Sequence, residues 1–342
     1  MMSGTSLDGL DMAYCEFDTD GKKVDYALLK ADTVPFDSDL RKKIIDCEGC
    51  NGEDIYRFSS FLGHYFGKQA REFIEKNNIE VDFIASHGQT VFHQPQRGFT
   101  VQIGDINAIA CETHCTVIGD FRSLDVALGG QGAPLVPIGD RLLFKEYDSC
   151  LNLGGFSNVS YDVDNIRKAY DICPVNIVLN HLAQMLGADY DKDGRIAQEG
   201  HVCVDLFNDF GNIPYFKNKE RKSLGKEFVK EYIFPLLDGY DISTQDKIAT
   251  YTVFVSSLIA ENIKGRTLVT GGGAYNKFLV EQVRKASVAD IIVPDKILVD
   301  YKEALIFAFL GMKRYRKEIN CLSSVTGAER DCCSGTVAEW VE

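Results

Sequence analysis

The sequence lacks long apolar runs and long basic runs, and both absences limit what the protein can bind. The longest apolar runs, such as residues 304–310, are too short to span a bilayer. The 342-residue chain has a net charge of −13, so nucleic acid and membrane are not expected as partners. An anionic ligand remains compatible with this charge, because a local cluster of amides and arginines can outweigh the global balance.

The sequence also lacks a basic region followed by an apolar stretch at its N-terminus. This argues against a signal peptide and favours cytoplasmic localisation, where the eleven cysteines are expected to be reduced. Because a structural zinc site generally uses two tightly spaced ligand pairs, free thiols are favoured over metal at two groups that have ligand-like spacing: Cys47 with Cys50, and Cys111 with His114 and Cys115. The adjacent Cys332 and Cys333 are expected to lie in a mobile tail.

Neither common nucleotide-binding fingerprint occurs, although three glycine-rich turns do. No turn continues as Gly-Lys-Ser/Thr, and none reads GxGxxG. The turns are SGTSLDG at residues 3–9, GGFSN at 154–158 and GGG at 271–273. A glycine turn lets backbone N–H groups approach phosphate oxygens without a Cβ in the way. Three such turns, two of them with Ser, Thr or Asn donors, predict a nucleotide held in a cleft between two lobes.

Hydrophobic periodicity predicts alternating helices and strands and therefore an α/β fold. Apolar residues from Ile55 to Phe73 recur at spacings of three and four, which predicts one helix with an apolar face. Further helices are predicted at 177–186, 244–263 and 304–315. Strands are predicted at 81–86, 99–103, 115–120 and 267–270, with a strand–turn–strand unit at 149–163.

Six motifs together carry a resemblance to a known family. In chain order they are MSGTSLDGLD, SHGQTVFHQP, VQIGD, DFRSLDVALGGQGAPLVP, LNLGGFSN and TGGGAYN. From Met2 to about Val325 the chain resembles the anhydro-N-acetylmuramic acid kinases, members of the actin-like, sugar-kinase and chaperone ATPase superfamily. The resemblance implies a two-lobe actin-like ATPase (ribonuclease H-like) fold with a ligand cleft between the lobes. Lobe I is expected at residues 1–138 with 303–342, and lobe II at 139–302.

The resemblance also implies an unusual reaction. Such enzymes open the 1,6-anhydro bridge of the sugar with water and transfer the ATP γ-phosphoryl group to O6, giving N-acetylmuramic acid 6-phosphate in cell-wall recycling. A carboxylate must activate the water. In the family that aspartate opens the motif Asp-x-Gly-Pro-Gly-Asn, which matches residues 171–176 here and makes Asp171 the expected general base. The alternative is a solvated or helix-capping aspartate.

Cys173 and Val175 replace the two glycines of that motif. Valine takes a positive φ only at high cost, so either the backbone differs here or the family glycine serves close approach. Asn180 stands where the family more often has aspartate. These replacements keep two other hypotheses open: a kinase for a related sugar, and a catalytically silent sugar or nucleotide sensor.

The remaining site residues follow from the matched motifs. ATP is expected to contact the three turns through Ser3, Gly4, Thr5, Ser6, Asp8, Gly9, Gly154, Gly155, Ser157, Asn158, Gly271, Gly272, Gly273 and Asn276. Mg²⁺ is expected to bind mainly through phosphates and water, oriented by Asp8 or Asp11. The expected sugar-binding residues are His87, Gln89, Arg122, Asp125, Gln131 and Glu303.

Three of the sugar-site residues have structural alternatives. Arg122 would meet the lactyl carboxylate of the sugar, or instead pair with Asp120 or Asp125. His87 would be a satisfied core histidine, and Glu303 would cap the start of the late helix. The partners expected are the small-molecule sugar and a second copy of the chain in a homodimer.

The family has an apolar strand directly before the MSGTS loop, where this sequence has only Met1. Without that strand, the segment 12–17 would lack a pairing partner on one side. We therefore expect the native chain to begin upstream, and the first turn to be less firmly held in the present chain.

Overall fold

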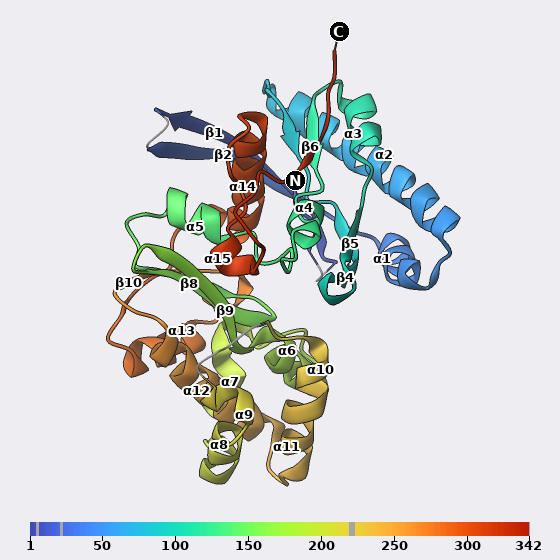
Figure 1. Cartoon of the computed structure of the whole chain (residues 1–342). Helices are drawn as coiled ribbons and strands as arrows, with labels where there is room; N and C mark the ends of the chain where they lie inside the picture. Colours follow the sequence, from blue (N-terminus) through green and yellow to red (C-terminus); the bar gives the residue numbers. More distant parts are fainter. Residues whose placement is uncertain (5–6, 21–22, 219–222, 342) are drawn as a thin grey trace. The chain divides into compact units, whose positions relative to one another are not determined.

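The computed structural model describes residues 1–342 except 5–6, 21–22, 219–222 and 342. The chain divides into two compact units, Met1–Leu143 with Tyr301–Glu342, and Phe144–Asp300 (Figure 1). These bounds differ by a few residues from those expected for the two lobes. The ligand-binding roles assigned to the lobes stay a prediction.

The first unit combines three small groups of strands with helices. Its longest strands form the antiparallel pair β1 (Gly9–Thr19) and β2 (Val24–Pro35). A second sheet has the order β12 (Thr336–Ala338), β6 (Val117–Gly119) and β3 (Ile84–Ala85), and a hairpin joins β4 (Gln89–Gln94) to β5 (Phe99–Ile103). The helices are α1 (Ser38–Asp46), α2 (Gly52–Asn77), α3 (Ile106–Thr113), α4 (Ser123–Ala127), α5 (Pro137–Leu143), α15 (Ser323–Thr326) and most of α14 (Lys296–Tyr315).

Helix α2 is the helix that the apolar spacing predicts. Asn51 caps its N-terminus by accepting a hydrogen bond from the backbone N–H of Asp54 at 3.0 Å. Its buried face includes Leu62, Phe66 and Phe73, which belong to the apolar core of this unit. Figure 1 shows α3 running beside α2. The amphipathic pattern therefore reports a real packing face.

The second unit is built on one five-stranded sheet with the order β11 (Asp290–Ile292), β10 (Arg266–Thr270), β7 (Ser149–Leu153), β8 (Phe156–Val163) and β9 (Ile166–Pro174). Strand β10 is parallel to both of its neighbours, whereas β7, β8 and β9 are successively antiparallel. The helices are α6 (Asn176–Met185), α7 (Arg195–Glu199), α8 (Val204–Gly211), α9 (Pro214–Lys217), α10 (Lys226–Phe228), α11 (Phe234–Gly239), α12 (Thr244–Asn262) and α13 (Lys277–Ala286). Of these, α12 is the most deeply embedded, with Tyr251 and Phe254 in the core.

Most of the predicted elements are confirmed, with one clear correction. The late helix begins at Lys296 rather than at residue 304. Asp295 stands at its start and accepts a hydrogen bond from the backbone N–H of Leu298 at 2.9 Å. Charged residues at 300, 302 and 303 separate the short apolar stretch at 297–299 from the apolar run at 304–310, so the apolar pattern places the start of the helix too late. Among the described residues, no helix combines the length and apolarity that crossing a membrane requires.

Met1 and Met2 occupy a strand position beside β1. The backbone N–H and C=O of Met2 exchange hydrogen bonds with Asp11 at 2.9 Å. On the other side, the Met1 carbonyl accepts from the backbone N–H of His87 at 3.1 Å, and the Met1 amine donates to the Ala85 carbonyl at 2.7 Å. These two residues therefore link the β1–β2 hairpin to the segment that follows β3.

A cavity of about 590 Å³ continues from Met1 within the first unit. Residues 12–18 of β1 line one side, and residues 79–85, which lead into β3, line the other. The Met1 amine is buried at this point, and the loss of hydration lowers its pKa to about 6. The cavity thus lies where a continuation of the Met1–Met2 strand would pair with the neighbouring backbone.

Extending the chain before Met1 by about five residues of alternating apolar character, a typical strand length, should raise the melting temperature. The added strand would bury apolar surface and supply hydrogen-bond partners to the edge of β1. It would also replace a buried amine by an amide. Stability of the present chain should rise with pH between about 6 and 8, because the amine binds protons more tightly in the unfolded chain than in the folded one.

The matched control is a Gly/Ser extension of equal length, which removes the amine but fills little of the cavity. Thermal melts at pH 6 and pH 8 should rank the apolar extension first at both. Equal melting temperatures for the two extensions would show that the cavity does not accept a strand.

Candidate functional site

In the second unit, the glycine turn between β7 and β8 is tied to the segment after β9. The Gly155 carbonyl accepts from the backbone N–H of Val175 at 2.8 Å, and the Gly154 carbonyl accepts from Asn176 at 3.3 Å. The side-chain amide of Asn176 donates to the Leu153 carbonyl at 3.1 Å. The second glycine turn and the Asp-x-x-Pro-x-Asn motif are therefore parts of one structural feature.

The third glycine turn, residues 271–273, lies against the end of β7. Gly271 has φ of 83°, and a Cβ built there would collide with the Asn152 side chain. A Cβ at Gly273 would lie 2.9 Å from the Leu153 carbonyl oxygen. Glycine is required at both positions because the two backbones approach so closely. Asn276 caps α13 by accepting from the backbone N–H of Leu279 at 3.0 Å.

A row of polar residues crosses three strands beside these turns. Asn158 on β8 pairs directly with Asn152 on β7 and with Asp171 on β9, and directly paired residues share a face of the sheet. The β8–β9 register shifts between Ser157 and Asn158, as at a β-bulge. Bulges commonly re-aim a side chain beside a functional site. Ser157 differs from its neighbours: it is fully buried and donates to the Cys173 carbonyl at 3.1 Å.

Asp171 is a half-buried carboxylate with a raised pKa. Its Oδ2 accepts from the backbone N–H of Leu224 at 2.7 Å, and its main-chain carbonyl accepts from the Tyr215 hydroxyl at 2.7 Å. Burial raises the pKa of Asp171 to about 6, because lost hydration outweighs the Leu224 hydrogen bond. The helix-cap alternative is wrong, since Val175 occupies the N-cap position of α6. A carboxylate with this pKa is suited to accept a proton near neutral pH.

Cys173 and Val175, the two replacements in the motif, contribute to core packing. Both are fully buried in the apolar core of the second unit, which also contains Val178. Val175 has φ of −128° and ψ of −89°, so no left-handed conformation is forced on it, but the pair lies outside the main α and β regions and the backbone is unusual for a β-branched residue. These replacements add bulk beneath the turn.

In the first unit, Arg122 is held by neutral acceptors. Its Nε and one terminal nitrogen donate to His87 Nε2 at 3.0 and 2.9 Å, and its other terminal nitrogen donates to the Gly132 carbonyl at 2.6 Å. The predicted alternative, a structural pair with Asp120 or Asp125, is wrong: those carboxylates accept from Ser123 and from Gly132, respectively. A guanidinium has five N–H donors, so this arrangement leaves donors for a ligand.

His87 is a buried imidazole whose two nitrogens are both occupied. Nδ1 lies 2.9 Å from the Gly88 carbonyl and must donate to it, because Nε2 accepts from Arg122. Its ring lies 4.6 Å from that of Phe307. Burial, with the nearby Arg122 charge, lowers the pKa of His87 to about 3, so the ring stays neutral. This favours the satisfied core histidine, and the contact of His87 with a sugar stays a prediction.

Asp125 is fully buried and anchors the Gly129–Gly132 loop. Its Oδ2 accepts from the backbone N–H of Gly132 at 2.7 Å, and its Oδ1 accepts from the Thr326 hydroxyl at 2.7 Å. A Cβ at Gly130 would collide with the Asp125 carboxylate. Gln131 is exposed on this loop, and its backbone N–H donates to the Thr326 carbonyl. Any influence of Asp125 on a ligand therefore acts through the loop.

Glu303 does not cap α14, because it lies well inside that helix. Lost hydration raises the pKa of Glu303, and the Arg122 charge acts in the opposite direction. Burial lowers the pKa of Arg122 to about 10, with Glu303 opposing the shift. The two side chains therefore share one electrostatic environment.

The first glycine turn is only partly described, because Thr5 and Ser6 lie outside the described residues. Ser3 is buried and donates to the Gln89 side-chain oxygen at 2.5 Å, so two expected ligand-binding residues bind each other. Gly4 is half-buried and Asp8 is exposed. Gly9 starts β1 against Val34, whose carbonyl leaves no room for a Cβ.

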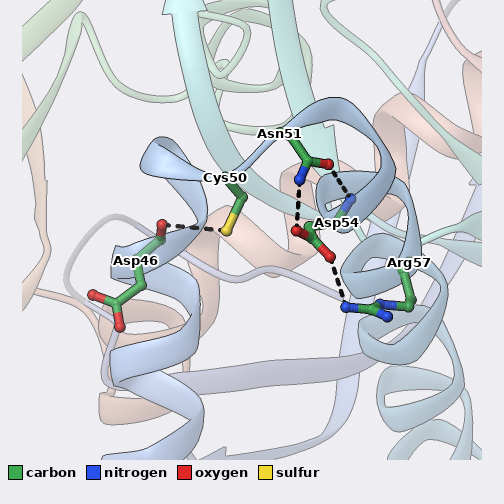
Figure 2. Close-up of polar contacts among 5 residues, drawn as sticks. All are labelled: Asp46, Cys50, Asn51, Asp54 and Arg57. Atoms are coloured by element: carbon green, nitrogen blue, oxygen red, sulfur yellow. Dashed lines mark hydrogen bonds and ion pairs between the residues drawn. The ribbon is translucent and has the colours of Figure 1, made fainter.

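Within the described part of the chain, one buried group has three side chains that could bind a metal ion: Asp125, Cys321 and Cys332. The cysteine groups singled out by spacing do not form such a cluster. Figure 2 shows the Cys50 thiol turned to the Asp46 carbonyl, at 3.6 Å, beside the Asn51–Asp54–Arg57 cap of α2. Cys332 is buried, so the mobile-tail prediction is wrong for it.

Replacing His87 with Leu should lower the free energy of unfolding by about 1–3 kcal/mol, because Arg122 donors lose a buried acceptor. His87→Gln keeps an acceptor, so its free energy of unfolding should fall by less.

The stability of the wild type should also depend on pH. Between pH 7 and 5, His87 should lower the free energy of unfolding by roughly 2 kcal/mol, since the imidazole gains a proton in the unfolded chain and not in the folded one. Urea titrations of both variants measure these effects. If the difference in free energy of unfolding between wild type and His87→Gln did not change with pH, the buried imidazole would not be neutral.

Comparison with known proteins agrees with the motifs. The chain matches the anhydro-N-acetylmuramic acid kinase family over residues 1–339. It is 34% identical over 370 residues to the anhydro-N-acetylmuramic acid kinase of Francisella tularensis subsp. novicida (strain U112), covering 98% of this chain and 97% of the relative. The Bacillus cereus (strain Q1) protein of the same name is 34% identical over 372 residues, with the same coverage.

Among solved structures, the activator of the 2-hydroxyisocaproyl-CoA dehydratase from Clostridium difficile with bound ADPNP gives a TM-score of 0.34 at 18% identity, covering 54% of this chain and 67% of that chain. A TM-score of this size assigns no fold. The sequence relatives are decisive, and the resemblance noted from the motifs is confirmed. The chain belongs to the anhydro-N-acetylmuramic acid kinase family, and it is accordingly an ATP-using phosphotransferase that acts on a sugar hydroxyl.

Proposed function

We propose that the protein opens the 1,6-anhydro bridge of anhydro-N-acetylmuramic acid with water and phosphorylates O6, giving N-acetylmuramic acid 6-phosphate and ADP. The observation that carries this proposal is Asp171, a carboxylate with a pKa of about 6 in the matched family motif. A simple sugar kinase needs a base only to accept the proton of a sugar hydroxyl. Hydrolytic opening of the bridge needs a base that accepts a proton from water, and the raised pKa of Asp171 suits it to this role.

Asp171 would act as the general base at the anomeric carbon. The carboxylate accepts a proton as the water oxygen bonds to C1, and the C1–O6 bond breaks. The leaving O6 carries the electron pair and receives the phosphoryl group. The Leu224 N–H donates to one carboxylate oxygen, and this single bond fixes the orientation of the carboxylate while the other oxygen accepts the proton.

Arg122 would bind the lactyl carboxylate of the substrate. His87 and Gly132 hold the guanidinium without neutralising it, because both acceptors are uncharged. The donors that these two leave are available in the planar geometry that matches a carboxylate. On this proposal Arg122 recognises the muramic, rather than the glucosamine, sugar.

The nucleotide would be bound by the three glycine turns. Gly271 and Gly273 lie where no Cβ fits, and the exposed Gly155 adds a further turn position without a side chain. Mg²⁺ accompanies ATP in most phosphoryl transfers and neutralises developing charge. Carboxylate oxygens suit Mg²⁺, and the exposed Asp8 is better placed than Asp11, which accepts from the Thr33 hydroxyl at 2.6 Å.

The deciding experiment follows the oxygen atoms. Reaction in ¹⁸O-water with ATP should give a phosphorylated product that carries ¹⁸O at the anomeric position in the initial product, before exchange. Phosphate without ¹⁸O would show phosphorylation of an already open sugar. ATP binding without turnover on either sugar would favour the silent sensor. Of the three residues that suggested another sugar, Cys173 and Val175 are fully buried, and Asn180 is half-buried on α6.

Asp171→Asn should reduce turnover by on the order of 10²-fold or more, because an amide cannot accept the water proton. ATP affinity, measured by calorimetry, should be unchanged. A turnover within a few-fold of wild type would exclude Asp171 as the base.

The pH profile gives an independent check on the same residue. Since the base acts when ionised, wild-type kcat/KM should fall as pH drops below about 6, the raised pKa of Asp171. Asp171→Asn should lose this acid limb. An identical acid limb in the variant would assign it to another group.

Arg122→Lys should raise KM for the anhydro sugar about 10-fold or more, since an ammonium loses the bidentate geometry. KM for ATP should not change. The informative comparison is an analogue that lacks the lactyl carboxylate, for which wild type and variant should perform alike. If the ratio of KM values for the two sugars were the same in the variant as in wild type, Arg122 would not bind the lactyl carboxylate.

The expected homodimer and the cytoplasmic location also remain proposals. Light scattering tests the first, because a dimer doubles the mass in solution. Fractionation of the source cell tests the second.

A further inference from the structure

Cys321 and Cys332 face each other across a short antiparallel bridge in the first unit. Each residue donates its backbone N–H to the carbonyl of the other, at 3.1 and 3.2 Å. Opposed residues in such a hydrogen-bonded pair have Cα atoms about 5.5 Å apart. That spacing lies within the range of about 4.4–6.8 Å that disulfides span. Both cysteines are free thiols and both are buried.

The segment around the two cysteines is firmly held in this register. The Asn320 side chain donates to the Leu310 carbonyl at 3.1 Å and to the Ser334 carbonyl at 2.8 Å. It also accepts from the backbone N–H of Ser334 at 2.7 Å. Asn320, which directly precedes Cys321, thus binds Ser334, two residues after Cys332, and this holds the two cysteines opposite each other.

The Cys321 thiol is also a partner of Asp125. It donates to Asp125 Oδ1 at 3.1 Å, and the Cys321, Cys332 and Asp125 side-chain atoms all lie within 4.8 Å of one another. The other Asp125 oxygen holds the Gly132 N–H, and the Gly132 carbonyl holds Arg122. A hydrogen-bonded chain therefore runs from the thiol pair to the guanidinium.

We propose that Cys321 and Cys332 are a modification site, at which a low-molecular-weight disulfide such as oxidised glutathione converts the two thiols into an intramolecular disulfide. Cys332, as thiolate, attacks one glutathione sulfur and releases the first glutathione thiolate, which takes up the proton that Cys332 lost. Cys321 then loses its proton and attacks the Cys332 sulfur of the mixed disulfide. The second glutathione leaves with that proton. Two thiols and one oxidised glutathione thus give one protein disulfide and two reduced glutathiones.

The electrostatics agree with this order of attack. Interaction with the Cys321 thiol lowers the pKa of Cys332, whereas interaction with Cys332, burial and the nearby Asp125 raise the pKa of Cys321. Cys332 is therefore the better nucleophile and Cys321 the resolving thiol. Oxidation consumes the proton that Cys321 donates to Asp125, so the carboxylate loses one of its donors and the Gly132 loop is held less firmly.

The chemical test is independent of kinase activity. The full chain is equilibrated in buffers of reduced and oxidised glutathione, quenched with acid and analysed by peptide mass mapping. The Cys321 and Cys332 peptides should be joined, with the loss of two hydrogen atoms. Cys321→Ser and Cys332→Ser should each abolish the link, while Cys333→Ser, the adjacent half-buried control, should keep it.

Two results would overturn the proposal. One is that both thiols stay reduced or carry glutathione singly while exposed Cys50 and Cys111 react. The other is a stoichiometric zinc ion in the purified protein that holds both thiols, which would make the cluster a metal site.

The functional consequence rests on the role proposed for Arg122. The oxidised chain should show KM for the anhydro sugar raised about 5-fold, the effect of about one hydrogen bond, with KM for ATP unchanged and reduction restoring both. Cys321→Ser retains a hydroxyl donor to Asp125 and should be insensitive to the oxidant. A disulfide that forms without this shift would overturn the coupling to Arg122, whereas a chain inactive in both redox states would count against the proposed kinase reaction.

Discussion

Each unit contains a partly buried charged group whose hydrogen-bond partners are all neutral. Asp171 is held by a backbone amide, and Arg122 is held by a neutral imidazole and a carbonyl. A neutral partner fixes a charged group without cancelling its charge. The cost is desolvation, which is visible as a raised pKa for Asp171 and a lowered pKa for Arg122. The same cost makes each group reactive: the carboxylate becomes a stronger base, and the guanidinium stays available to an anion.

Glycine placement explains how the second unit surrounds its polar row with backbone. The turns at Gly154 and Gly271 meet at the end of β7, where side chains at the glycine positions would hold the two backbone segments apart. The absence of Cβ atoms at Gly271 and Gly273 lets this backbone approach Leu153 closely. Cys173 and Val175 show the limit of this rule. They replace family glycines, and both side chains are fully buried in the core, although the φ and ψ angles of Val175 lie outside the main allowed regions.

The sequence predicted the elements well wherever one local pattern decides them. The helix α2 and the strand β5 follow from periodicity, and the glycine turns follow from composition. The start of α14 was missed because charged residues interrupt its apolar pattern, and tertiary packing rather than local pattern fixes it. The partners of the site residues were missed for another reason. Arg122 meets His87 across 35 residues and Asp125 meets Cys321 across 196, and no local spacing reports such pairs.

Asp125 shows why those long-range pairs matter for function. The motif placed it among the sugar-binding residues, yet its carboxylate is fully buried and bound on both oxygens. Its partners come from the Gly132 loop, from α15 and from the strand-like segment at Cys321. The carboxylate thus holds the Gly132 backbone N–H, and the Gly132 carbonyl accepts from Arg122. A residue can therefore belong to a binding motif because it shapes the backbone behind the site, and the thiol beside it gives that backbone a chemical control that the motif alone does not reveal.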